Sequence, residues 1–166
     1  MDERKRCCFS GRRPQHLAWG SREDDPRCLA LKRELAARLE GVYESGYRDF
    51  LCGMALGCDM YFAEAVLALR ERHPDVRLEA VIPCGDQPER WPLRQRKRYN
   101  ALLDSCNAVT VLQIRYTPDC MMRRNRYMVD HASLLLACHD GQPGGTMNTL
   151  RYAMERGLEI VLIELS

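Results

Sequence analysis

The chain has 166 residues, of which 46% are hydrophobic and 29% charged, and its formal net charge is +2. This balance is typical of a globular protein and excludes a disordered chain, and no apolar run approaches the ~20 residues that a membrane-spanning helix needs. The charged opening Met1–Arg6 is followed by an apolar stretch too short for a signal peptide. We therefore expect a cytoplasmic protein without membrane contact, folded as a single domain over residues 1–166.

Short apolar runs alternate with longer stretches of helical periodicity, which is typical of repeated βα units around a mostly parallel sheet. The last three apolar runs contain hardly any polar residue, which predicts strands covered on both faces. The pattern indicates an α/β fold with about six strands. These are Arg6–Phe9, Arg48–Cys52, Arg77–Ile82, Ala108–Gln113, Leu134–Cys138 and Glu159–Leu165.

Amphipathic helices are predicted between the strands. Leu31, Leu35, Leu39 and Val42 share one helical face, and Phe62, Val66 and Leu69 share another. Weaker patterns predict helices over 94–104, 121–131 and 147–156. Two long irregular stretches, 12–27 and 83–92, follow strand ends, and ligands of parallel sheets bind outside the carboxyl ends of the strands.

The first of three glycine turns at strand ends is Ser10-Gly11-Arg12-Arg13-Pro14. Gly11 lets the backbone approach a phosphate closely, and Arg12 and Arg13 supply charged hydrogen-bond donors. The alternative is a tight turn with two solvated arginines.

The second turn places Gly53 and Gly57 between a strand and a helix, where free N–H groups and the helix dipole favour an anion. It lacks the G-x-G-x-x-G spacing of NAD-binding proteins, so NAD binding of that kind is not expected. Asp59 is either a ligand contact or the N-cap of the following helix.

The third turn has Gly144 and Gly145 before Thr146, which either caps the last helix or borders the ligand. Because all three turns follow parallel strands, we expect them to meet at one edge of the sheet and to form one site for a nucleotide or another phosphate-bearing ligand.

Two basic segments suggest different partners. Arg115 at a strand end, and Arg124 with Asn125 in the next helix, suit recognition of a phosphate facing the glycine turns. Residues 90–99 combine arginines and a lysine with Trp91 and Tyr99, a mixture compatible with nucleic acid. For either segment the alternative is a solvated helix face.

The nine cysteines form no C-x-x-C pair, and the four histidines show no metal-binding spacing. We interpret the cysteines as small buried apolar residues in a reducing compartment, and we expect no metal and identify no cofactor. The residues indicate no catalytic constellation. His139 beside Asp140, at a strand end, is a candidate for the crevice or an ordinary buried histidine.

Taken together, these motifs resemble the YpsA-like family of the SLOG superfamily, which also contains the DNA-processing protein DprA and the LOG phosphoribohydrolases. The likeness covers nearly the whole chain. It implies a Rossmann-like three-layer α/β/α sandwich that binds nucleotides or nucleotide-derived ligands at the carboxyl edge of its sheet. The segments that carry it are Ser10–Pro14, Gly53–Asp59, Trp91 with Arg98 and Tyr99, Arg124–Asp130, and Gly144–Thr149.

The relatives named above differ in function. Met121-Met122-Arg123-Arg124-Asn125 is similar to the M-x-x-R-K stretch of LOG enzymes, but the glutamate that follows their P-G-G-x-G-T is missing, since no acid occurs here before Glu155. That absence counts against LOG-like hydrolysis. Gly53-x-Ala55-x-Gly57-x-Asp59 is similar to the S-G-x-A-x-G-I-D motif of DprA, which binds single-stranded DNA.

The sequence therefore predicts a nucleotide-binding sensor or regulatory protein rather than an enzyme. The alternatives are a nucleotide N-glycosidic hydrolase, with Arg124, Asp59 and Asp140 as catalytic candidates, and a binder of single-stranded nucleic acid. Tyr127 and Met128, taken as exposed, suggest a homodimer. The expected ligand-binding residues are Ser10, Gly11, Arg12, Arg13, Gly53, Gly57, Asp59, Arg115, Arg124, Asn125, Gly144, Gly145 and Thr146.

Overall fold

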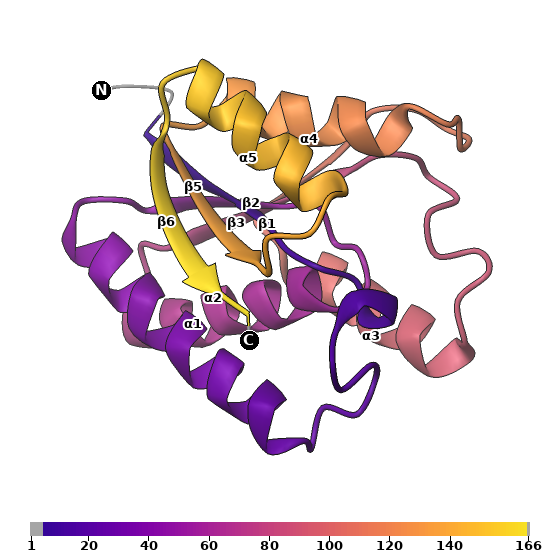
Figure 1. The fold of residues 1–166 in the computed structure, drawn as a ribbon, viewed down its shortest axis with the longest axis horizontal. Coiled ribbons are helices and arrows are strands. Elements are labelled where there is room, and N and C mark those ends of the chain that lie inside the picture. The colour runs from indigo at the N-terminus through magenta and orange to yellow at the C-terminus, as the bar shows by residue number, and fades with distance from the viewer. Residues whose placement is uncertain (1–4, 166) are drawn as a thin grey trace.

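The computed structural model describes residues 5–165, so residues 1–4 and 166 of the predicted domain lie outside the described part. The described residues form six strands and five α-helices that alternate along the chain, with a short 3-10 helix between the first strand and the first α-helix (Figure 1). The elements are β1 (Arg6–Ser10), η1 (Pro14–His16), α1 (Pro26–Glu44), β2 (Asp49–Cys52), α2 (Cys58–Arg72), β3 (Arg77–Ile82), α3 (Leu93–Ser105), β4 (Ala108–Val111), α4 (Cys120–Asp130), β5 (Leu134–His139), α5 (Gly145–Glu155) and β6 (Glu159–Glu164).

All six strands are parallel and lie in the order β4-β3-β2-β1-β5-β6. Helices α1, α2 and α3 cover one face of the sheet, and α4 and α5 cover the other (Figure 1). The predicted fold class, an α/β Rossmann-like three-layer sandwich with about six strands, is confirmed.

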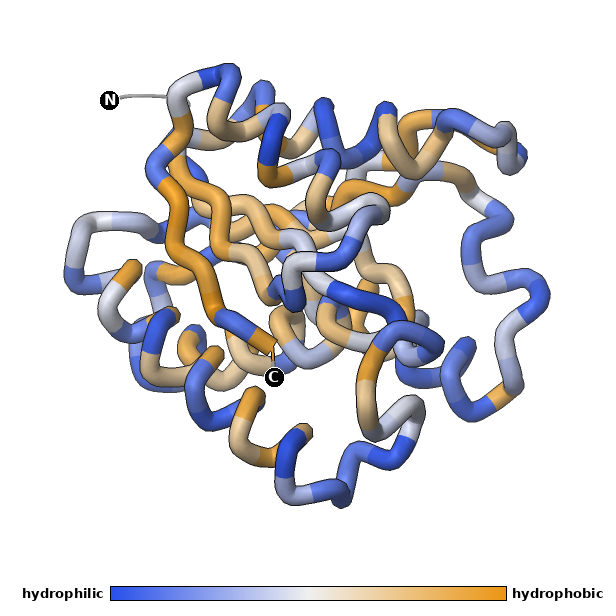
Figure 2. The backbone as a smooth tube through the Cα atoms, in the orientation of Figure 1, coloured by the Kyte–Doolittle hydropathy of each residue, from blue (hydrophilic) through white to orange (hydrophobic). Residues whose placement is uncertain are grey.

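The period of two along each strand divides the core into two layers. Cys7 and Phe9 of β1 point into the layer under α1 and α2, whereas Cys8 points into the layer under α4 and α5. The apolar strands run through the middle of the molecule, between helices whose outer faces are hydrophilic (Figure 2). The predicted stripes of α1 and α2 are buried as expected.

Two predictions about the strands were wrong. Strand β4 ends at Val111 instead of Gln113, and it is an edge strand whose Val109 and Val111 are 46% and 52% exposed. Strand β6 forms the other edge and is only partly buried. Apolar composition indicates a buried strand, but it does not distinguish a central strand from an edge strand that a helix covers on one side alone.

The cysteines are buried apolar residues, as predicted: all nine are free thiols, and only Cys106 is partly exposed. Between residues 5 and 165 no group of three or more His, Cys, Asp or Glu side chains is arranged to hold a metal ion. Within the same range no helix has the length and apolarity that a membrane span requires.

The order in which strands are added to the sheet reverses between β1 and β5. These two parallel strands are neighbours although they are far apart in sequence. The connections before this point lead to one edge of the sheet and those after it lead to the other. Loops at the carboxyl ends of such a pair of strands diverge and leave a crevice, which is where parallel α/β sheets bind ligands.

Candidate functional site

A cavity of about 320 Å³ lies at this reversal point, beyond the carboxyl ends of β1 and β5. Its walls come from the β1 turn, the first turns of α2 and α4, and the β5–α5 turn. The predicted ligand-binding residues that line it are Ser10, Gly11, Arg12, Arg13, Asp59, Arg124, Asn125, Gly144, Gly145 and Thr146.

Arg12 joins all three glycine turns although it belongs to the first. Its side chain is buried, with Nε 3.5 Å from Oδ2 of Asp140 and Nη1 donating to the carbonyl oxygen of Pro143 at 3.4 Å. Its backbone carbonyl accepts a hydrogen bond from the N–H of Cys58, at the first residue of α2. Arg12 thus holds the β1 turn against both other turns and keeps a buried guanidinium beside the cavity.

Arg124 is the second buried cation of the cavity wall, only 4% exposed. Its Nη1 donates to the carbonyl oxygen of Gly53 at 2.6 Å, and its Nε donates to Oδ1 of Asn125 at 2.8 Å. Burial lowers the pKa of Arg124, against the attraction of Asp59, which raises it. Arginine remains charged in proteins even when desolvated, so this wall carries a positive charge with little water around it.

Asp59 lies in the first turn of α2 but is not its N-cap, because the cap position belongs to Gly57. Its Oδ2 accepts a hydrogen bond from the N–H of Ala55 at 3.0 Å, which orders the turn before the helix. Burial raises the pKa of Asp59, opposed by the charge of Arg124 and by the bond from Ala55. A buried carboxylate and a buried arginine that perturb each other's pKa values are typical of functional sites.

The glycines of the second turn support the cavity wall without lining it. A Cβ atom at Gly53 would lie 2.2 Å from Nη1 of Arg124, so only glycine leaves room for the guanidinium. Gly57 has a φ angle of +88°, and a Cβ atom there would lie 2.8 Å from the carbonyl oxygen of Arg12. Both glycines are required by the close approach of a neighbouring arginine, not by a phosphate against the turn itself.

The N-terminus of α5 opens into the cavity through Gly145 and Thr146. Gly144 is the N-cap, with a φ angle of +144°, and no side chain forms a capping hydrogen bond. The cap function considered for Thr146 is therefore wrong. The first N–H groups of a helix have no intrahelical partner, so this end of α5 offers donors and a positive dipole to a ligand.

Three expected site residues lie elsewhere. Gly53 and Gly57 are behind the wall, and Arg115 is exposed on the loop after β4, outside the cavity. Asp140 contacts Arg12 but does not line the cavity. His139, the residue before Asp140, is buried and does not line the cavity either. Both Arg115 and Arg124 were predicted to face the ligand, but the fold places Arg115 on an exposed loop and Arg124 on the inward face of a helix.

Other lining residues are not among the predicted ligand-binding residues. Gln15 and His16 follow the first turn in η1, and Pro118 precedes α4. Their closeness to the predicted motifs is the one signal that could have found them. Phe9, Ala55, Met121 and Met122 supply the apolar part of the wall.

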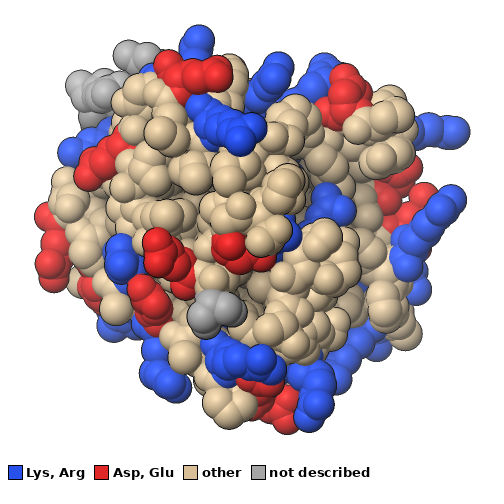
Figure 3. Space-filling view, in the orientation of Figure 1, with Lys and Arg blue, Asp and Glu red and all other residues tan. Residues whose placement is uncertain are grey.

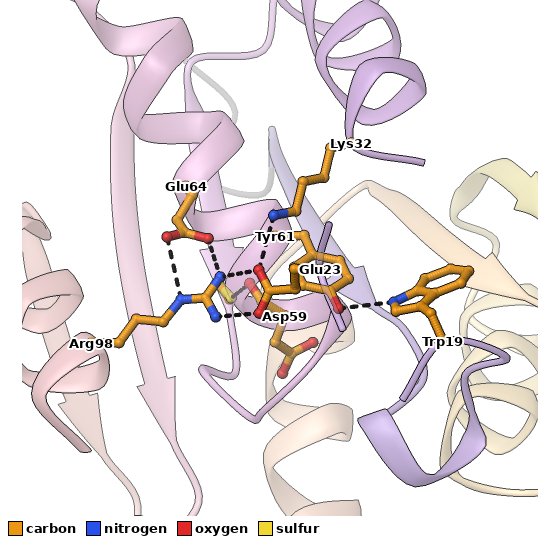
Figure 4. Close-up of polar contacts among 8 residues, drawn as sticks. Trp19, Glu23, Lys32, Asp59, Tyr61, Glu64 and Arg98 are labelled. Carbon is orange, nitrogen blue, oxygen red and sulfur yellow. Dashed lines mark hydrogen bonds and ion pairs between the residues drawn. The ribbon is translucent and has the colours of Figure 1, made fainter. Parts of the chain in front are cut away.

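An ion-pair network anchors the long loop between η1 and α1 (Figure 4). Arg98 of α3 bonds both oxygens of Glu23, at 2.6 and 2.9 Å, and also pairs with Glu64 of α2. Lys32 donates to Glu23 at 2.9 Å. Burial alone lowers the pKa of Arg98, but its bonds to Glu23 and Glu64 outweigh that effect and raise it.

The same contacts alter the interpretation of residues 90–99. Arg98 is committed to Glu23 and Glu64, and Tyr99 is 4% exposed, with the ring of Trp91 packed edge-on against it at 5.2 Å. The stacking side chain and one of the cations predicted for nucleic acid are thus engaged inside the protein. On the face in Figure 3, Lys and Arg side chains are interspersed with Asp and Glu and form no continuous basic surface.

The exposure assumed for the predicted homodimer was wrong. Met128 is only 2% exposed, and Tyr127 is partly buried and stacks on His131 with ring centroids 4.0 Å apart. Tyr127 and Met128 are adjacent and both largely apolar, so the sequence does not show which of them faces solvent. The packing of α4 against the sheet decides this. The homodimer itself stays a prediction.

The fold and the cavity define the class of this protein: a parallel Rossmann-like α/β protein with an arginine-lined site at the reversal point of its sheet. The model of the YpsA family, described as the YspA SLOG family, matches residues 7–163. The chain belongs to this family, as its motifs predicted.

Two bacterial relatives illustrate the match. The uncharacterized SPbeta prophage-derived protein YoqJ of Bacillus subtilis (strain 168) is 30% identical over 143 residues, covering 78% of this chain and 83% of that protein. A UPF0398 protein of Bacillus pumilus (strain SAFR-032) is 29% identical over 127 residues, covering 75% of this chain and 68% of the relative.

Solved structures share the fold at low sequence identity. DNA processing protein A (DprA) from Streptococcus pneumoniae superposes with a TM-score of 0.65 at 15% identity, over 98% of this chain and 51% of its own, so this chain corresponds to about half of it. DNA processing protein A from Helicobacter pylori, a structure that describes its single-stranded DNA binding mode, gives 0.65 at 14% identity over 99% and 67%.

Proposed function

We propose that the cavity binds a phosphate-bearing, nucleotide-derived ligand and that the protein acts as a sensor or regulator. The observation that carries this proposal is the convergence of two buried arginines, Arg12 and Arg124, on the open N-terminus of α5. Arginine side chains and helix N-termini are both common partners of phosphate in proteins, and here two arginines and one helix N-terminus lie around one cavity.

The electrostatics of the cavity support an anionic ligand. Arg12, Arg13 and Arg124 line it, whereas Asp59 is its one acidic lining residue among those the structure describes. Burial raises the pKa of Asp59, so the charged form of this carboxylate is less favoured in the cavity wall than in water. A desolvated arginine binds phosphate more strongly than a solvated one, because little water competes for its donors.

A thermal-shift panel tests the proposal. ADP-ribose, NAD, the nucleoside monophosphates and cyclic nucleotides are added to the purified protein, and a ligand at 100 times its Kd stabilises by about 2.7 kcal/mol. For a chain of this size that corresponds to a rise in Tm of about 5–10 °C. Failure of every ligand to raise Tm would contradict the proposal.

Two arginine variants make the panel specific for the cavity. Arg12→Gln removes a buried lining cation and is expected to abolish the shift, whereas Arg115→Gln removes an exposed cation outside the cavity and is expected to keep it. Equal loss in both variants would show that binding depends on overall charge, not on this site.

Cleavage of an N-glycosidic bond is the catalytic alternative, and the observation that favours it is Asp59, a buried cavity carboxylate with a raised pKa. The α5 segment has no acid before Glu155, at the end of the helix away from the cavity, so Asp59 with Arg124 would have to act alone. Incubation with nucleoside monophosphates and chromatography for free base decides this; unchanged substrate would exclude it.

Binding of single-stranded nucleic acid is a further candidate, favoured by the exposed cations Arg90, Arg94, Arg96 and Lys97. The H. pylori protein of similar fold has a described single-stranded DNA binding mode. Anisotropy of a labelled oligothymidylate over a range of salt concentrations tests it. Charge-driven binding must weaken as salt rises, so affinity that ignores salt would exclude this mode.

A further inference from the structure

A second cavity, of about 500 Å³, adjoins the proposed phosphate site. It lies between the β3–α3 loop and the β4–α4 loop, and its lining includes Trp91, Tyr116, Gln87 and Met121. Met121 also lines the first cavity, so this side chain forms part of both walls.

One backbone carbonyl links the two cavities. The oxygen of Gly53 accepts from Nη1 of Arg124 at 2.6 Å on the side of the first cavity. It also accepts from Nε2 of Gln87 at 3.3 Å on the side of the second. The Met121 side chain and the Gly53 carbonyl oxygen therefore connect the walls of the two cavities.

The loops around the second cavity are held in place without a ligand. The N–H of Tyr116 donates to Oδ2 of Asp86 at 3.3 Å, and the N–H of Gly85 donates to the carbonyl oxygen of Gln113 at 2.9 Å. Trp91 is fixed by its edge-on contact with the buried Tyr99. Tyr116 is 60% exposed, so a ligand that enters this cavity from solvent can reach its ring.

We propose that the second cavity holds the base of the ligand, so that the ligand is a nucleotide and not a sugar phosphate. This inference rests on the proposed function, because it takes the phosphate to lie in the first cavity. A wall that presents an indole and a phenol beside a cationic phosphate site suits a planar heteroaromatic ring joined to a phosphate through a short linker. Stacking on such side chains strengthens binding for any base.

Calorimetry with ribose 5-phosphate and the four common nucleoside 5′-monophosphates tests the inference. The best nucleotide is expected to bind about tenfold or more tightly than ribose 5-phosphate, because only it supplies a ring to stack. Equal affinity for ribose 5-phosphate and all four nucleotides would overturn the inference and leave phosphate binding intact. No binding of any of the five would overturn both proposals.

Tyr116→Ala isolates the role of the ring. It removes an exposed side chain, so the fold should be kept, and it is expected to weaken nucleotide binding about tenfold while leaving ribose 5-phosphate unchanged. Ile114→Ala is the matched control, since Ile114 is 81% exposed on the same loop and does not line this cavity. An equal effect of Tyr116→Ala on both ligands, or no effect, would contradict a base-binding role.

Tryptophan fluorescence reports on the second cavity directly and does not depend on a change in protein stability. The chain has two tryptophans: Trp19 is buried against Tyr61, and Trp91 borders the second cavity. Nucleotide is expected to change the emission of Trp91, and saturating ribose 5-phosphate is expected to leave it constant. Identical emission changes with both ligands would contradict the placement of the base.

Discussion

The guanidinium of Arg124 donates a 2.6 Å hydrogen bond to the carbonyl oxygen of Gly53, a residue 71 positions earlier in the chain. This contact holds a buried cation on the wall of the first cavity. The same carbonyl oxygen accepts a hydrogen bond from Gln87, which lines the second cavity. The contact with Arg124 depends on glycine, because a Cβ atom at position 53 would lie 2.2 Å from Nη1. Gly53 and Arg124 belong to two separate sequence motifs, but the fold joins them in one buried contact.

Gly53→Ala is expected to displace Arg124 and to lower the free energy of unfolding by about 1–3 kcal/mol, because the buried guanidinium must leave its place. Ligand-induced thermal shift should be lost as well. Urea unfolding gives the first quantity. Gly41→Ala in α1 is the control: a Cβ atom there meets nothing within 4 Å, so stability should rise by about 0.5–1 kcal/mol. Unchanged stability and binding in Gly53→Ala would disprove the role of this contact.

Acid stability should depend on Glu23. Burial alone raises its pKa, but bonds from Arg98 and Lys32 outweigh burial and hold the pKa below the ordinary value of 4.5. A depressed pKa in the folded state stabilises the protein above the unfolded pKa, and this stabilisation disappears as pH falls through the folded value. Glu23→Gln should therefore cost about 1–2 kcal/mol at pH 7 and progressively less below pH ~4.5.

Glu34→Gln is the matched control for that experiment. Glu34 pairs with Arg38 at 3.4 Å on the surface of α1, where both side chains are largely exposed. Such pairs contribute at most about 0.5 kcal/mol, so the variant should follow the wild type at every pH. A constant difference between Glu23→Gln and wild type from pH 7 to pH 3 would contradict the network's role.

The pH dependence of ligand binding should reflect Asp59. Burial raises its pKa above the ordinary value of 3.8, so the side chain becomes charged only at higher pH. Its negative charge then opposes an anionic ligand, and affinity should fall as pH rises through the raised pKa. Asp59→Asn keeps an oxygen for the N–H of Ala55 but has no charge, so the ratio of mutant to wild-type affinity should rise with pH. A ratio independent of pH would contradict this.

The cysteine thiols should be nearly inert in the native state. Burial raises the pKa of Cys8 to about 12 and that of the partly exposed Cys106 to about 11. Thiolate is the reactive form, so at pH 7.5 a thiol reagent should modify the native protein slowly and all nine cysteines rapidly in urea. Rapid native modification of several cysteines would contradict their assignment to the core.

The sequence was informative where a local pattern determines the structure. Short apolar runs located the strands, and the stripe from Leu31 to Val42 located α1, because the helical period follows directly from backbone geometry. Glycine turns at the strand ends predicted where a site would form, since parallel strands end at one edge.

Long-range packing limited the rest. Val109 and Val111 resemble residues of a central strand, yet β4 lies at an edge, a position that the order of strands alone decides. Arg115 and Arg124 were both predicted to bind the ligand, but the fold places Arg115 on an exposed loop and Arg124 in the cavity wall, against the carbonyl oxygen of Gly53. The ion pairs of Arg98 likewise depend on Glu23, 75 positions away.

The most direct test of the proposed site is a crystal structure of the protein with the nucleoside monophosphate that binds best. The phosphate is predicted to lie in the first cavity, within hydrogen-bonding distance of Arg12, Arg124 or the first N–H groups of α5, with the base against Tyr116 and Trp91. A nucleotide bound elsewhere on the protein, with this cavity filled by solvent alone, would contradict the central claim.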